Sequence, residues 1–151
     1  MTNETALFLK LLLHAGLIEV YRENLDQLLT EASDLDGALL ELAFCTQNIN
    51  KSISLLRDFT YHKDIDHHEV YSRMMSVFQN QYLNQTMSQD EVSEAMHLAA
   101  MNSGKEMSLP WEPIKNLIFY YEEVVDGYYP EDIYHEQFLD LLIGKERLES
   151  E

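Results

Sequence analysis

Apolar residues recur along this chain at intervals of three and four, the spacing that places side chains on one face of an α-helix. The stripe of Val92, Ala95, Met96 and Ala99 is one example. No segment shows the apolar–polar alternation of a half-buried strand. The pattern predicts an all-α fold: a single-domain bundle or short α-solenoid over residues 1–151, with about six to eight helices in antiparallel pairs.

Residues that favour the ends of helices divide the chain into separate predicted helices. Glycine suits the position after a helix because it adopts the left-handed conformation freely, and short polar side chains suit the N-cap because they accept a backbone N–H bond. Gly16 is predicted to end or bend the first helix, and Gly144 to stop the last. The predicted N-terminal signals are Ser33 or Asp34, Asn48, the capping box of Ser88 and Glu91, and Pro130 at a first helical position.

The segment YYEEVVDGYYPED, residues 120–132, places four tyrosines among five acids. Helical phase puts Phe119 with the polar residues of the preceding helix and leaves Tyr120 at their flank. Two interpretations follow: another helix covers Phe119, or both rings are displayed for a partner inside an acidic rim. The face predicted to be buried consists of Ile114, Leu117, Ile118, Tyr121, Val124 and Val125.

The turn that follows offers further contact residues. One of Tyr128 and Tyr129 can pack against the start of the last helix while the other projects outward. Glu131 and Asp132 have a structural reason to be there as well, because acids are favourable at a helix N-terminus. The predicted partner-binding residues are Phe119, Tyr120, Glu123, Asp126, Tyr128, Tyr129, Glu131 and Asp132.

The charge is strongly negative, with 27 acids against 10 bases and a net charge of −17. Residues 111–151 carry −8 of it. Such a field repels nucleic acid and anionic membrane surfaces and attracts basic proteins, although solubility alone is an equally acceptable reason for it. The single cysteine, the acidic Glu4 before the first apolar run, and Lys10 and His14 within that run lead us to expect a cytoplasmic protein.

Histidines offer the only alternative chemistry. His62, His67 and His68 lie in the acid-rich segment 62–69, but a zinc site needs three or four converging ligands, and adjacent histidines on a helix point about 100° apart. We therefore expect His67 to pack at a boundary. A di-iron site in a helix bundle needs two E-x-x-H pairs and two further glutamates. The chain has one such pair, Glu94 and His97, and Asp132 and His135 only imitate a second, so we do not expect a di-iron site.

No phosphate loop, dinucleotide fingerprint or nucleophile motif occurs, so we expect neither an enzyme nor a cofactor.

Three stretches together hold 66 of the 151 residues: GLIEVYRENLDQLLTEASDLDGALLELAFC, SQDEVSEAMHLAA and YYEEVVDGYYPEDIYHEQFLDLL. In this order they resemble a group of uncharacterised bacterial all-helical proteins that look like toxin immunity proteins. The tryptophan expected in the second helix is absent, and Tyr21 and Leu25 occupy that region. The resemblance implies a small helical inhibitor of a bacterial toxin and supplies no catalytic residues.

Three functional hypotheses follow. The first is an acidic protein-binding module, most concretely an immunity-type inhibitor of a basic toxin such as a nuclease. The second is a metal-binding helical protein or enzyme that uses segment 62–69. The third is a structural helical adaptor or homo-oligomer whose acids only keep it soluble.

Overall fold

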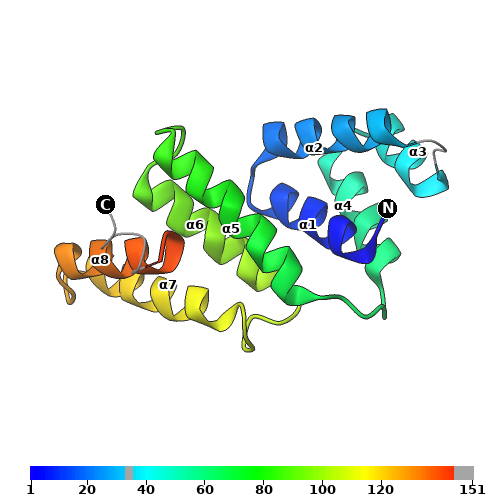
Figure 1. The fold of residues 1–151 in the computed structure, drawn as a ribbon. Coiled ribbons are helices and arrows are strands. Elements are labelled where there is room, and N and C mark those ends of the chain that lie inside the picture. Colours follow the sequence, from blue (N-terminus) through cyan, green and yellow to red (C-terminus); the bar gives the residue numbers. More distant parts are fainter. Residues whose placement is uncertain (33–35, 145–151) are drawn as a thin grey trace. The chain divides into compact units, whose positions relative to one another are not determined.

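The computed structural model describes residues 1–32 and 36–144. Within these ranges the chain forms helices and no strand, so the predicted all-α fold is confirmed (Figure 1). The number of helices in the same ranges lies within the predicted six to eight. The helices are α1 Asn3–His14, α2 Ile18–Glu31, α3 Gly37–Phe44, α4 Ile49–Thr60, α5 His67–Leu83, α6 Gln89–Asn102, α7 Glu112–Val125 and α8 Glu131–Leu142.

The chain divides into two compact units, Met1–Val70 and Tyr71–Glu151. The division falls near the start of α5, whose remaining length belongs to the second unit. That the chain is one domain stays a prediction.

In the first unit, α1 is the most buried helix. Its residues 6–9 and 11–13 are all buried, and it packs against α2 and α4. A helix that is apolar on nearly every face belongs in an interior, which is where α1 lies. Gly16 ends it as predicted, with φ +79°, and the N–H of Leu17 donates to the carbonyl of Leu12 at 2.9 Å. This is the pattern of a Schellman motif.

Side-chain caps begin α4 and α6 as predicted. The Asn48 side chain accepts from the Lys51 N–H, and Ser88 and Glu91 form a complete capping box. Gly144 follows α8 with φ +91°. Pro130 differs from its predicted place by one residue, since it is the N-cap of α8 and Glu131 is the first helical residue. These signals are local, which is why the sequence alone reveals them.

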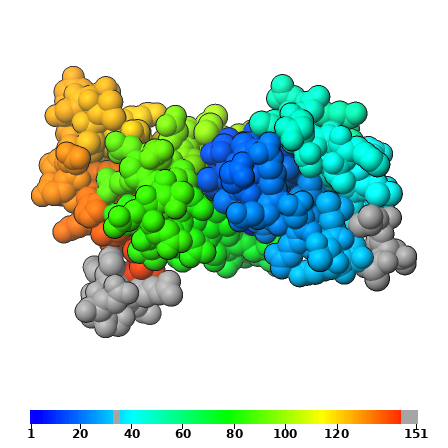
Figure 2. All heavy atoms as spheres, turned by 90° about the horizontal axis from the view of Figure 1, so that it is seen from above, coloured from blue at the N-terminus to red at the C-terminus, as the bar shows by residue number. Residues whose placement is uncertain are grey.

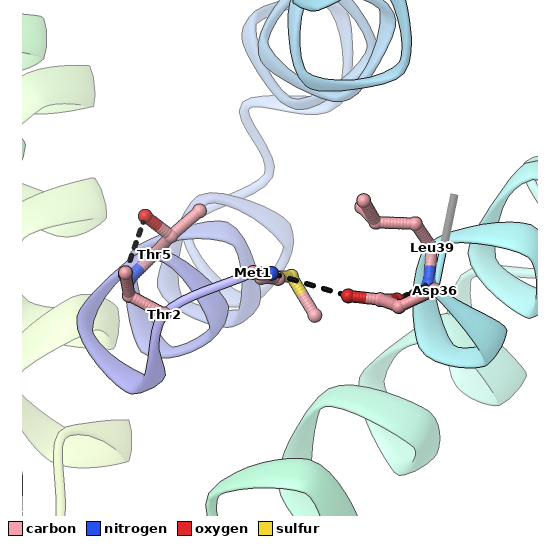
Figure 3. A network of polar contacts seen from close by, with 5 residues as sticks. All are labelled: Met1, Thr2, Thr5, Asp36 and Leu39. Carbon is pink, nitrogen blue, oxygen red and sulfur yellow. Dashed lines mark hydrogen bonds and ion pairs between the residues drawn. The ribbon is translucent and has the colours of Figure 1, made fainter. Parts of the chain in front are cut away.

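Asp36 is the N-cap of α3 and also meets the chain's N-terminus (Figure 3). One carboxylate oxygen accepts from the Leu39 N–H at 2.7 Å, and the other accepts from the Met1 ammonium at 3.1 Å. The Leu39 bond is the main reason that the pKa of Asp36 is lowered, and the ammonium adds to the effect. Ser33 and Asp34, the residues predicted for this cap, lie outside the described residues.

The second unit buries apolar side chains from all four of its helices. Met74 and Phe78 of α5 are fully buried, and the predicted α6 stripe of Val92, Ala95, Met96 and Ala99 is buried throughout. Trp111, just before α7, is buried and makes a T-shaped contact with Tyr71 at a centroid distance of 5.4 Å. α7 packs on α6 and on α8, and α7 and α8 run antiparallel (Figure 1). This core holds the α7–α8 pair in place.

Replacing Asp36 with alanine should lower the free energy of unfolding by about 1 kcal/mol, because an N-cap is lost. Asp36→Asn should lose less, since its amide oxygen still accepts from Leu39. Urea denaturation followed by circular dichroism, with hydrogen exchange at the α3 amides, measures both. The carboxylate's contribution is present above the ordinary aspartate pKa and is lost as pH falls through the lowered folded-state pKa. An equal loss in the exposed control Asp64→Ala would contradict the capping role.

Candidate functional site

The turn between α7 and α8 has a defined backbone. α7 ends at Val125, and Gly127 takes φ +83°, a left-handed conformation that glycine adopts without strain. The Tyr128 N–H donates to the Glu123 carbonyl at 2.8 Å, and the Gly127 N–H donates to the Val124 carbonyl at 3.0 Å. These bonds form a Schellman motif. The direction in which the chain leaves α7 is therefore fixed by backbone hydrogen bonds.

Phe119 and Tyr128 are displayed. Phe119 is 59% exposed and Tyr128 is 80% exposed, so the alternative that another helix covers Phe119 is wrong. Figure 2 shows the segment around this turn, in amber and orange, at the surface on the face drawn. Single exposed apolar residues are ordinary, but two large rings close to one turn are a reason to look for a partner.

The other two aromatic residues of the prediction, Tyr120 and Tyr129, connect Phe119 to α8. The Tyr120 ring makes a T-shaped contact with Phe119 at a centroid distance of 5.9 Å, and its centroid lies 5.0 Å from that of Tyr129. The Tyr129 hydroxyl accepts a hydrogen bond from the Gln137 side chain of α8 at 3.1 Å. Tyr120 and Tyr129 are both half-buried. The structure thus brings Phe119, Tyr120 and Tyr129 into one row of rings.

Acids neighbour these rings in the sequence. Asp126, Glu131 and Asp132 are exposed, and Glu123 is half-buried. Residues 112–142, which span α7, the turn and α8, hold eight Asp or Glu and one Lys. We call the eight predicted residues, Phe119, Tyr120, Glu123, Asp126, Tyr128, Tyr129, Glu131 and Asp132, the acidic aromatic surface.

Tyr134 and Phe138 of α8 form the support beneath this surface. Both are buried, and the Tyr134 hydroxyl shares a short hydrogen bond with the Ser93 hydroxyl of α6. Burial raises the pKa of Tyr134 to about 12, against the lowering effect of the Ser93 bond. Tyr121 was predicted to lie on the buried face of α7; it packs against Tyr134 at a centroid distance of 5.6 Å and is half-buried. The neutral Tyr134 phenol, hydrogen-bonded to Ser93, thus holds α8 against α6.

Two predictions of side-chain placement are wrong. Val125 was assigned to the buried face of its helix but is 68% exposed, because it is the last residue of α7 and the chain turns away directly after it. Helical phase turns Glu94 and His97 away from the stripe of Val92 to Ala99, which predicts that both face solvent. Glu94 is exposed as predicted, but His97 is half-buried.

The histidine segment does not assemble a metal site. Among the described residues, no three His, Cys, Asp or Glu side chains are grouped so that they could hold a metal ion. His62 lies against the Tyr61 ring at 4.0 Å, His67 is half-buried, and His68 is exposed. His135, from the imitation of a second E-x-x-H pair, hydrogen-bonds to Gln89 of α6.

A groove of about 390 Å³ between α7 and α8 was not predicted. Tyr120 is the only residue of the acidic aromatic surface that lines it. The polar lining residues Asn116, Gln137 and Asp140 were missed. Each is an ordinary polar helix residue in the sequence, and only the pairing of the two helices brings them together.

No protein-family model, curated protein or solved structure matches this chain. Separately, no helix in the described part of the chain combines the length and the apolar character needed to cross a membrane.

Replacing Phe119 or Tyr128 with alanine should change the free energy of unfolding by less than about 0.5 kcal/mol, because both rings already face water. The matched core variant Phe138→Ala should lose about 3–5 kcal/mol. Urea denaturation followed by the fluorescence of the single tryptophan, Trp111, reports on this unit. A loss above about 2 kcal/mol for Phe119→Ala, the range of buried-residue truncations, would mean that its ring is part of the core.

The raised pKa of Tyr134 predicts that the protein loses stability at alkaline pH. Its pKa is raised from 10.0 to about 12, so the folded state holds the phenol proton more tightly than the unfolded state does. Its contribution is therefore complete below pH 10 and falls as pH rises toward 12, by about 3 kcal/mol at most. Denaturation at a series of pH values should show a steeper alkaline decline for the wild type than for Tyr134→Phe. Equal slopes would contradict the prediction.

Proposed function

We propose that this chain is a protein-binding module that docks a basic protein through the acidic aromatic surface of α7, the turn and α8. The single observation that carries the proposal is the exposure of Phe119 and Tyr128 among acids, on a backbone held by hydrogen bonds. Exposed aromatic rings supply contact area at small entropic cost, and surrounding carboxylates pair with Lys and Arg.

The most specific form of the proposal is an immunity-type inhibitor of a basic toxin, such as a nuclease. A nuclease cleft is built to bind phosphates, so a rigid surface with many carboxylates and few cations can compete for it. Long-range attraction between opposite net charges also speeds the encounter. The resemblance to toxin immunity proteins agrees with this form, and nothing in the geometry of the described residues favours a catalytic role instead.

A capture experiment with paired variants tests the docking surface. The wild type, a double variant Phe119→Ala and Asp126→Lys, and a control double variant Phe44→Ala and Asp64→Lys are used to capture proteins from cells that encode the chain. Phe44 is 88% exposed and Asp64 is exposed, so the control makes the same two changes in the first unit.

We expect one basic protein that the wild type and the control recover and that the first double variant loses. Its binding should weaken as salt rises, because exposed charges are screened. If that protein is a nuclease, adding the purified wild-type chain should suppress its cleavage of DNA or RNA. Equal recovery by all three proteins would reject the surface, and binding without inhibition would reject the inhibitor form alone.

A further inference from the structure

The groove between α7 and α8 has the chemistry of a site for one cationic side chain. From α7 it is lined by Pro113, Asn116, Leu117 and Tyr120, which follow one another at the three- and four-residue spacing of a helix face. Its volume of about 390 Å³ lies at the lower end of the range for ligand sites. An open groove with apolar lining residues and the Tyr120 ring can hold the stem of a long side chain along its surface.

The α8 wall supplies the charge. Gln137, Asp140 and Leu141 line this side, again at helical spacing. Asp140 is exposed, and among the described residues it is the only charged one that lines the groove. Its carboxylate can therefore accept hydrogen bonds from a ligand at the open side of the groove.

The side-chain oxygen of Gln137 is a second hydrogen-bond acceptor, and none of the described residues donates to it. Its Nε2 donates to the Tyr129 hydroxyl, while its Oε1 is buried and has no hydrogen-bond partner in the described part of the chain. A buried carbonyl oxygen without a donor costs free energy, which a ligand N–H that reaches it recovers.

We propose that this groove binds an arginine side chain of the basic partner, an inference that rests on the proposed function. The aliphatic stem lies against Pro113, Leu117 and Leu141. The planar guanidinium stacks on Tyr120, and its N–H groups reach Asp140 and Gln137. Lysine fits this set less well, because its ammonium is a compact, strongly hydrated charge that neither stacks nor forms paired bonds with a carboxylate.

The test uses two blocked tripeptides, acetyl-Gly-Arg-Gly-amide and acetyl-Gly-Lys-Gly-amide, titrated into the ¹⁵N-labelled full chain. We expect the arginine peptide to shift the side-chain amide signals of Gln137 and Asn116 with about tenfold higher affinity than the lysine peptide, the effect of one further charge-assisted bond. Asp140→Asn should remove this preference. The matched control Asp64→Asn, which removes the same charge from an exposed position that lines neither the groove nor the acidic aromatic surface, should keep it.

Equal affinities for the two peptides, or an arginine preference that survives Asp140→Asn, would overturn the inference. The chain has its own arginine at position 147, so the titration is repeated with Arg147→Ala. Arginine binding that appears only in that variant would identify the chain's own side chain as the occupant, which also overturns the proposal of a partner arginine.

The outcomes separate this inference from the proposed function. If the peptides show no preference while the Phe119 and Asp126 double variant still loses its partner, only the arginine groove is wrong. If the groove prefers arginine but all capture variants recover the same proteins, the docking surface is wrong.

Discussion

Because an α-helix turns about 100° per residue, α7 cannot bury Leu117, Ile118 and Phe119 against the same neighbours. Leu117 and Ile118 are buried, together with Ile114, and α7 packs on α6 and on α8. The next ring along the chain is therefore turned outward. Tyr120 then lies at the edge of the helix pair, where it meets Tyr129 and lines the groove. One geometric constraint thus produces both the exposed ring and the half-buried one.

The carboxylates of α7 and α8 repel one another, since residues 112–142 hold only one lysine against eight acids. What opposes this repulsion is the burial of Tyr134 and Phe138 and the bond between Tyr134 and Ser93, which hold α8 onto the core. The Schellman motif fixes the turn between the helices. A surface ordered in this way loses little conformational freedom when a partner binds, so more of its contact energy is available for affinity.

The sequence predicts this fold well where one residue decides a local conformation. Gly16, Asn48 and the Ser88–Glu91 pair act within one helical turn, and each takes its predicted role. Prediction fails where the outcome depends on where a neighbouring element stops. Val125 has the phase of a buried residue but comes after the last position that other helices cover. Likewise, phase alone places Phe119 on the polar side, yet whether another helix covers it depends on the packing of the whole unit.

The groove is a second feature that the sequence alone does not predict. Asn116 and Asp140 are 24 positions apart in the sequence, and nothing in either local pattern connects them. They line one groove because α7 and α8 run antiparallel in a register set by the buried residues and the turn. The two proposals assign the acidic aromatic surface and the groove different roles in binding. The exposed acids attract a basic protein over long range, and the groove then distinguishes arginine from lysine at contact, because stacking and paired hydrogen bonds act only at short distance.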